Sequence, residues 1–503
     1  MDTKRRLLYN SITGLILQVT SVICGIIVPR LIIGEYGSEI NGLVQSITRF
    51  LSIISFMEMG VGYVIQSALY KPLAEHDSVK QSQIMASGGK FFSNIGRILL
   101  VYVVVLIAIF PTINKSDFSW LFTATLIAAI SISYFAQYYF GIVDRILLTA
   151  DQRGYIQYTA QILTLISNTI LCIILIKLKA SIQVVKLFSS LVFLIRPIAL
   201  RILINRQYKI DRHIKYDVDP ISHKMSGLAM HISQVILEDT DTIVLTVLSS
   251  LSNVSIYSVY HLIVYGVKQI VFSVTSGFDS ILGKLWAKQE IEKLRLFFSV
   301  IEWMIHTCTT LIFSCCAVLI IPFVQVYTKG ISDAQYVQPL FSMIIVIATA
   351  GHCLRLPYNK MIIAGGHFKE THSCYIISAA LNIVISCITV YIWGLVGVAI
   401  GTLIAMFYQT IWMAVYDSKH FLKIPITTFI KQLLVDAGTF ILIVFSTSWI
   451  QLNQVSYGSW IVMGITVFAI AAIETIVINC LLYRQHFGEA AKLLKRKFKK
   501  QNV

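Results

Sequence analysis

Polar residues inside long apolar stretches are the residues of this sequence best placed to do chemistry. In the stretch from 226 to 249 the polar side chains recur at spacings of three and four, as His231, Gln234, Glu238 and Asp241. That spacing puts them on one face of a helix. We interpret this face as the lining of a water-filled cavity, where Glu238 or Asp241 takes up a coupling proton or sodium ion. The alternative is that these acids pair with basic residues on neighbouring helices.

Basic residues in other apolar stretches suit an anionic ligand. An arginine fork makes two charge-assisted hydrogen bonds to a phosphate, and a desolvated site strengthens them. The candidates for substrate binding are Arg30, Arg49, Lys268 and Arg355. Glu58, grouped with the ion-coupling candidates, follows Arg49 by nine residues, about half a turn round a continuous helix. The two side chains are therefore not expected to face the same narrow cavity. Other basic residues within apolar stretches are Arg97, Lys186 and Arg196.

The composition indicates a membrane protein. The chain has 503 residues, of which 56% are hydrophobic and 13% charged, with a mean hydropathy of +0.75. Soluble proteins carry about 25% charged residues, so most of this surface is expected to meet the lipid bilayer. Lys and Arg number 41 against 25 Asp and Glu, a net charge of +16. Such an excess fits nucleic acid, an anionic membrane face or an anionic substrate, and the positions of the charges decide between them.

Apolar runs of about 20 residues predict spanning helices, and runs this long are too long for barrel strands. The sequence predicts an all-α polytopic protein with about fourteen spans. They lie at 10–34, 42–67, 91–113, 118–142, 156–177, 181–204, 226–249, 254–279, 297–326, 336–363, 372–392, 394–416, 429–451 and 459–483.

The basic residues predict the orientation of these spans. With the N-terminus inside, the inner segments hold 31 Lys and Arg and the outer ends hold six. This bias predicts that both termini are cytoplasmic. The basic excess therefore reports topology, and no nucleic-acid partner is expected. The tail 484–503 is interpreted as a solvated basic anchor, with a short helix on anionic lipid as the alternative.

A shift of 214 residues reveals an internal repeat. It places Ala150 on Ala364 and Asn168 on Asn382. We predict an N-terminal six-helix lobe over 1–224 and a C-terminal six-helix lobe over 225–416, followed by two additional helices over 417–483 and the tail. Duplicated membrane bundles bind their substrates between the halves, near the midplane. The repeat therefore indicates a transporter.

Motifs for covalent chemistry are absent from the sequence. It contains no P-loop, no GxGxxG after a strand, no HExxH, and no CxxC pair among its nine cysteines. We therefore expect no nucleotide cofactor and no metal site, and interpret the cysteines as small core residues. The N-terminal apolar run continues to residue 34 without a small-residue cleavage site, which indicates a retained span. No outer loop exceeds about a dozen residues, so an enzyme with an outward catalytic platform is disfavoured.

Three segments carry a family resemblance: 34–77 with the Arg30 before it, 239–262, and 361–402. The matching residues are Arg30, Tyr36, Gly37, Gly42, Leu43, Glu58, Gly60, Asp241, Tyr257, Ala364, Asn382, Gly394, Gly397 and Gly401. These segments resemble the Wzx-type polysaccharide flippases, of the O-antigen and capsule kind, in the multidrug/oligosaccharidyl-lipid/polysaccharide exporter superfamily. The resemblance covers nearly the whole chain, although the motifs are degenerate.

The resemblance implies two six-helix lobes followed by two extra helices. It implies a carrier in the bacterial plasma (inner) membrane that moves a polyprenyl-diphosphate-linked oligosaccharide to the outer leaflet by alternating access, for cell-surface polysaccharide biosynthesis. The family's cationic cavity would here be supplied by Arg30, Arg49 and Lys268. Polysaccharide polymerases and glycosyl transferases are the protein partners that it implies.

Three other functions remain open. A cation-coupled multidrug antiporter of the same fold predicts that Glu238 or Asp241, rather than the arginines, is indispensable. A membrane glycosyl transferase or polymerase predicts an acidic outer platform, against which the short loops argue. A non-transporting assembly scaffold leaves the buried charges without a role.

Overall fold

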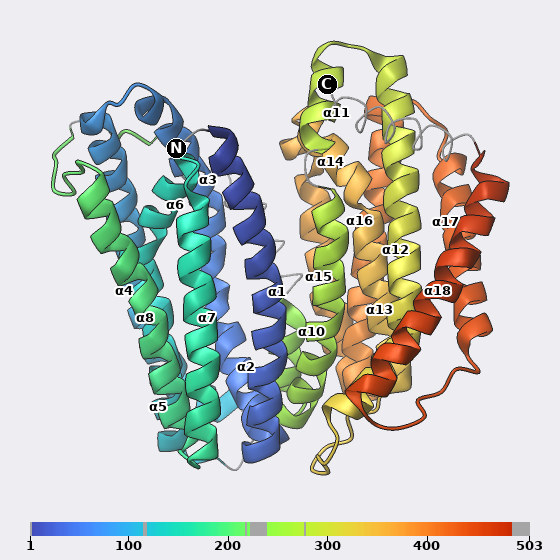
Figure 1. Ribbon diagram of the computed structural model, residues 1–503, viewed down its shortest axis with the longest axis horizontal. Coiled ribbons are helices and arrows are strands. Elements are labelled where there is room, and N and C mark those ends of the chain that lie inside the picture. Colours follow the sequence, from blue (N-terminus) through green and yellow to red (C-terminus); the bar gives the residue numbers. More distant parts are fainter. Residues whose placement is uncertain (1–2, 114–117, 217–218, 222–238, 276–277, 485–503) are drawn as a thin grey trace. The chain divides into compact units, whose positions relative to one another are not determined.

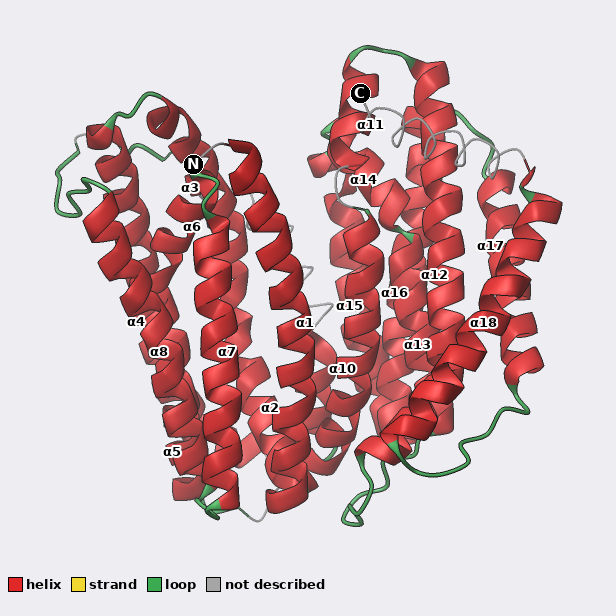
Figure 2. Ribbon diagram, viewed as in Figure 1, coloured by secondary structure: helices red, strands yellow, loops and turns green. Residues whose placement is uncertain are grey.

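A computed structural model describes residues 3–113, 118–216, 219–221, 239–275 and 278–484. All regular secondary structure in these ranges is helical (Figure 2). The chain divides into two compact units, Met1–Ser255 and Ile256–Val503. They are called unit 1 and unit 2 below, and each is described by itself.

Unit 1 contains long helices joined by short turns (Figure 1). They are α1 (Thr3–Tyr36), α2 (Ser38–Ser52), the 3₁₀ turn η1 (Ile53–Ser55), α3 (Phe56–Ala74), α4 (Ser78–Ile113), α5 (Trp120–Ala136), the π-helical turn η2 (Gln137–Gly141), α6 (Ile142–Ala150), α7 (Gly154–Lys177) and α8 (Ile182–Gln207). Residues 239–248 are also helical.

Unit 2 begins within α10 and repeats much of this arrangement. Its elements are α10 (Leu251–Val274), α11 (Phe278–Ala287), α12 (Ile291–Tyr327), α13 (Pro339–Leu354), α14 (Leu356–Gly365), α15 (Phe368–Trp393), α16 (Leu395–Asp417), the π-helical turn η3 (Ser418–Leu422), α17 (Thr427–Thr447) and α18 (Tyr457–Leu482). The last two helices pack on α12.

Twelve helices of the described residues are long and apolar enough to cross a membrane. Two of the fourteen predicted spans are not among these twelve helices, each for a different reason. The span predicted at 42–67 is not among the twelve, and a 3₁₀ turn, η1, lies between its helices α2 and α3. Most of the span predicted at 226–249 lies outside the described residues. The fourth predicted span ends too early, because η2 carries the helix past 142 to Ala150.

Helix bounds reproduce the 214-residue shift. Adding 214 to the bounds of α6 gives 356–364, and α14 covers Leu356–Gly365. The same shift moves α4 to 292–327 and α7 to 368–391, which α12 and α15 match within two residues. An irregularity of the helix also recurs at the same place, since η2 precedes α6 and Arg355 separates α13 from α14. The repeat therefore extends to the position of this irregularity.

Side-chain contacts join the predicted inner segments at one end of each unit. In unit 1, Arg6 of α1 donates to the Asp151 carbonyl (3.0 Å) in the turn after α6. At the opposite end, the Tyr36 hydroxyl donates to the Ala180 carbonyl (2.6 Å). In unit 2, Arg295 Nε donates to the Leu422 carbonyl (2.6 Å). Within each unit, the alternation of ends agrees with the predicted alternation of loops.

Candidate functional site

Arg49, a predicted substrate ligand, forms an ion pair with Asp239. Its Nη1 lies 2.6 Å from Asp239 Oδ1, and the Ser52 hydroxyl donates to Asp239 Oδ2 (3.0 Å). The Arg49 side chain is 31% exposed and that of Asp239 only 10%. Arg49 lies near the end of α2, just before η1, and Asp239 begins the helical segment 239–248. Sequence reasoning missed Asp239, although it weighed pairing as the role of the acids in this stretch.

The predicted polar stripe falls mainly outside the described residues. His231, Gln234 and Glu238 all lie there, whereas Asp241 is described and buried. The side chain of Glu58 also lies outside the description. The expectation that Glu58 and Arg49 lie on opposite helix faces assumed a continuous helix. The break at η1 removes that assumption.

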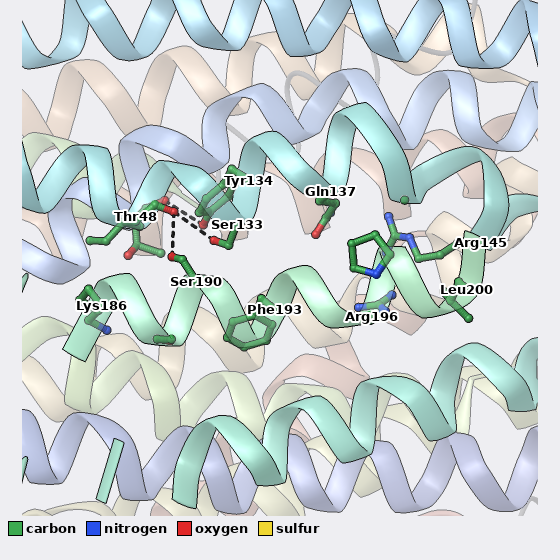
Figure 3. Close-up of a pocket in the computed structure, with 14 residues that line it drawn as sticks. Thr48, Ser133, Tyr134, Gln137, Arg145, Lys186, Ser190, Phe193, Arg196 and Leu200 are labelled. Carbon is green, nitrogen blue, oxygen red and sulfur yellow. Dashed lines mark hydrogen bonds between the residues drawn. The ribbon is translucent and has the colours of Figure 1, made fainter. Parts of the chain in front are cut away.

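A cavity of about 330 Å³ in unit 1 gathers three basic residues (Figure 3). Arg145 comes from α6, and Lys186 and Arg196 come from α8. Their side chains lie along the cavity, with Arg145 and Arg196 near one another and Lys186 toward the other end. The remaining lining residues are Thr48, Ile130, Ser133, Tyr134, Gln137, Gly141, Ser189, Ser190, Phe193, Pro197 and Leu200. The described lining therefore contains no acidic residue.

Two helix irregularities shape this cavity. The π-helical turn η2 interrupts the helical ladder beside it, as such turns often do at functional sites. On the facing helix, Pro197 removes a backbone hydrogen bond inside α8. A Cβ added to Gly141 would lie 3.0 Å from Pro197 Cβ, so glycine permits the close approach of the two helices. Polar and basic side chains therefore face a gap inside an otherwise apolar bundle.

Nearby hydrogen bonds keep the polar wall of the cavity in place. The Tyr134 hydroxyl donates to the Thr48 carbonyl (3.3 Å), and the Ser190 hydroxyl donates to the Ile130 carbonyl (3.5 Å). Asp144, next to Arg145, is paired with another residue: its Oδ1 lies 2.7 Å from Arg212 Nη2. The nearest acidic residue in the sequence is therefore already neutralised by a cation that does not line the cavity.

In unit 2 the structure brings Lys268 and Arg355 together around His352. Arg355 Nη2 lies 2.9 Å from His352 Nε2, and His352 Nδ1 lies 2.8 Å from Met406 Sδ. Lys268 interacts electrostatically with His352, and its Nζ lies 5.4 Å from the ring centres of Tyr265 and Phe272. Lys268 is 7% exposed and Arg355 is 3% exposed. Two predicted substrate ligands thus share one buried site.

Arg355 is poorly satisfied for a buried cation. Its Nε and Nη1 have no hydrogen-bond partner, and no carboxylate of the described residues pairs with it. Burying an unpaired charge costs several kcal/mol (order of magnitude). A buried guanidinium with open donors is the arrangement that an anionic group would complete.

The two basic sites occupy related places in the repeat. Each lies at an irregularity of the fourth spanning helix of its half: η2 between α5 and α6 in unit 1, and Arg355 between α13 and α14 in unit 2. Each also packs against the sixth spanning helix, α8 or α16. In unit 2, Thr410 of α16 donates to the Gly351 carbonyl (2.7 Å). Discontinuous helices recur at the binding sites of duplicated carriers.

Arg30 is not part of the unit 1 site. It is half-buried on α1 and does not line the cavity of unit 1. A Cβ on Gly34 would lie 2.9 Å from its Nη1, so the guanidinium runs along its own helix. Arg145 is the residue that sequence reasoning missed, because it was counted within an inner loop that began at 143. The continuation of apolar sequence in Ile146 to Leu148 is the signal for a longer helix.

Comparisons with known proteins show the fold. No protein-family model matches the sequence, and a search of curated proteins finds no match. Among solved structures, lipid II flippase MurJ in an inward closed conformation matches with a TM-score of 0.67 and 15% identity, over 95% of this chain and 99% of that one. An inward-facing multidrug resistance MATE family transporter of the MOP superfamily matches with a TM-score of 0.60 and 14% identity, over 81% and 98%.

A MOP superfamily transporter from Pyrococcus furiosus, described with a reversed polarity of its binding pocket, matches with a TM-score of 0.55 and 14% identity, over 84% and 98% of the two chains. At these identities the likeness establishes a shared fold. The chain is therefore a multi-pass membrane protein with the fold of these flippases and transporters. Its cargo must be argued from its own residues.

Proposed function

We propose that this protein is a flippase for a polyprenyl-diphosphate-linked oligosaccharide, working by alternating access in the bacterial plasma membrane. The observation that carries the proposal is the basic character of both sites. Three basic side chains line one cavity, and Arg355 is buried beside Lys268 with no hydrogen bond from its Nε or Nη1 to a described residue.

A diphosphate is the chemical group that these sites suit. It carries negative charge on oxygens that accept charge-assisted hydrogen bonds from arginine and lysine. Serine, threonine and glutamine side chains of the unit 1 cavity offer hydrogen bonds of the kind that sugar hydroxyls use. The lipid tail needs no polar path because it can remain in the bilayer. No covalent chemistry is required of the protein.

Arg49 belongs to the proposal in a different way from Arg355. Its ion pair with Asp239 would have to open, or to accept an anion beside it, for Arg49 to touch a diphosphate. We assign direct contact to Arg355, Lys268, Arg196 and Lys186. Arg49 and Arg30 remain candidates for contact.

The test is the appearance of a fluorescently labelled polyprenyl-diphosphate oligosaccharide in the outer leaflet of proteoliposomes. Each hydrogen bond to a charged group contributes about 1.5–3 kcal/mol. Arg355→Ala and the double variant Lys186→Ala/Arg196→Ala should therefore lower the initial rate about tenfold or more. Arg206→Ala is the matched control, because Arg206 is an exposed arginine on the same helix as Arg196 and does not line the cavity. Equal rates in all variants at equal reconstitution would contradict the proposal.

A cation-coupled multidrug antiporter is the second candidate. Buried acidic side chains in unit 2, described below, favour it, because organic cations are attracted to carboxylates. It predicts proton-dependent efflux of a fluorescent organic cation that survives Arg355→Ala. The same proteoliposomes can be loaded with either cargo, so the two candidates are compared in one preparation.

A further inference from the structure

Unit 2 contains a separate group of polar side chains on α12, α14, α16 and α17. We call it the carboxylate cluster, and it consists of Glu302, His306, Tyr358, Asp417 and Asp436. His306 Nδ1 lies 2.6 Å from Asp436 Oδ2. The Tyr358 hydroxyl donates to Glu302 Oε1. Four helices thus bring three acids and one imidazole into a bundle that is otherwise apolar.

Asp417 is the unsatisfied member of this cluster. It is the last residue of α16 and is 0% exposed. Neither of its carboxylate oxygens accepts a hydrogen bond from a residue that the structure describes. Asp417 interacts electrostatically with Glu302 and Tyr358 of the cluster. A buried carboxylate without donors is costly unless it carries a proton or meets a cation.

The charge balance of the cluster also indicates that one of its carboxylates carries a proton. His306 can neutralise one carboxylate, Asp436, to which Gln432 Nε2 also donates (3.2 Å). Glu302 receives one hydrogen bond from a neutral hydroxyl, and Asp417 receives none. Neighbouring carboxylates without a cation between them cannot both stay ionised at low cost. Two protons would make the interior neutral, and at least one is needed if Glu302 and Asp417 are not both to be ionised.

Among the described residues, the salt bridges give the cluster His306 and no other basic partner. Arg295 is occupied by Leu422 and Glu292. The other titratable or charged groups on the elements around it are Lys284 on α11, Lys360 on α14, Tyr416 on α16, Lys419 and His420 on η3, Lys431 on α17, Glu474 on α18, and Tyr483 and Arg484 after it.

A cavity leads to the cluster. It has a volume of about 370 Å³, and Glu302 and Gln432 form part of its wall together with Lys431, Tyr483 and Arg484. Trp303 closes another part, held by a hydrogen bond from its Nε1 to Asn479 Oδ1 (2.6 Å). Lys431 and Arg484 are exposed. Water can therefore reach Glu302, whereas Asp417 is fully buried and does not line this cavity.

We infer that the carboxylate cluster is a proton-binding site of unit 2, filled through this cavity. A proton from water adds to a carboxylate oxygen of Glu302, and Asp417 is the buried acceptor that it can pass to. The described residues contain no group of three or more His, Cys, Asp or Glu side chains that could hold a metal ion, and the ligand that we assign to the cluster is a proton. The inference does not depend on the cargo and goes beyond the proposed function.

The test is infrared spectroscopy of the purified full-length protein in nanodiscs, recorded as a difference between neutral and alkaline pH. Exposed acids are ionised at neutral pH, so a carboxylic-acid carbonyl band there reports a protonated buried acid. We expect this band in the wild type and its partial loss in Asp417→Asn. Glu292→Gln is the matched control, because Glu292 lies on α12, as Glu302 does, with an 86% exposed side chain. It should leave the band unchanged.

Glu302→Gln provides a second variant in case Asp417→Asn does not fold, and the wild-type spectrum is informative without either. A wild type without the band, or a band that both variants retain in full, would overturn the inference. Loss of the band on adding sodium chloride, but not potassium chloride, would overturn it in favour of a sodium site. Because the measurement needs no cargo, failure of the flippase proposal leaves its result intact.

Discussion

Glycine at helix crossings sets how closely the helices of this protein approach. A Cβ built on Gly42 of α2 would lie 1.9 Å from the Leu251 carbonyl oxygen. Next to it, Asn41 Nδ2 donates to Ser255 Oγ (2.8 Å), so a buried hydrogen bond and a close backbone contact hold this crossing. Residues 41 and 255 are also positions that the 214-residue shift superimposes. Small residues permit such contacts where the bilayer gives helices no hydrophobic reason to associate.

Gly42→Ala should therefore destabilise the protein. The added methyl group meets backbone, which cannot rotate away, and overpacking of this kind costs about 1–3 kcal/mol. Gly89→Ala is the control, since Gly89 lies inside α4 with nothing within 4 Å of the added atom. Alanine there should be neutral or stabilising by up to about 1 kcal/mol. Thermal unfolding in detergent, followed by intrinsic fluorescence, measures both; equal unfolding temperatures would contradict the assignment of Gly42 to a close crossing.

At the scale of elements, Asp151 connects three helices at one end of unit 1. It accepts from Arg6 of α1 (3.3 Å), from Arg153 Nε before α7 (2.9 Å) and from the Tyr208 hydroxyl after α8 (2.5 Å). Burial and this hydrogen bond to Asp151 raise the pKa of Tyr208, so its hydroxyl remains a donor at neutral pH. The favourable contribution of a group with a raised pKa is complete below its ordinary value and is lost as pH rises above it.

Asp151→Asn should lower the unfolding temperature at pH 7, because it removes the charge that two arginines share. The three partners are partly buried, so the loss is expected at about 1–3 kcal/mol, above that of a surface pair. Glu75→Gln is the comparison: its pair with Lys71 on α3 has side chains 50% and 79% exposed, and exposed pairs contribute about 0–1 kcal/mol. A loss in Asp151→Asn no larger than in Glu75→Gln would show that the cluster does not hold the helix ends together.

The same scale shows what could be predicted from the sequence. Apolar run length located the helices well, because about 20 apolar residues have few alternatives to spanning a bilayer. It could not locate η1 or η2, since a single 3₁₀ or π turn depends on neighbouring helices and leaves no apolar gap. Lys268 and Arg355 share one site because of tertiary packing, which the periodicity of a single helix cannot predict. Arg145 was missed because the helix continues through η2, so a residue assigned to a loop lies within a helix.

For the whole molecule, the orientation in the membrane is the property that charge predicts most directly. The positive-inside bias places the turn before α12 in the cytoplasm and the loop after it outside. The contacts within each unit already place predicted inner segments together, as Arg295 and Leu422 illustrate. They do not by themselves say which end faces the cytoplasm, so sidedness remains a prediction with its own test.

Two single-cysteine variants, one on each side of α12, test the predicted sidedness. Lys288 precedes this 37-residue helix and Ser332 follows it, and both are exposed. In intact cells a membrane-impermeant maleimide should label Ser332→Cys at once, whereas Lys288→Cys should react only after permeabilisation. The unmodified chain is the background control: its described cysteines include six buried ones, Cys24, Cys172, Cys315, Cys316, Cys353 and Cys374. The reverse labelling pattern would show that the protein has the opposite orientation in the membrane, with the cavity beside Glu302 on the outer face. Proton entry to the carboxylate cluster would then come from outside the cell, so the labelling result also fixes the side from which the infrared experiment's proton is drawn.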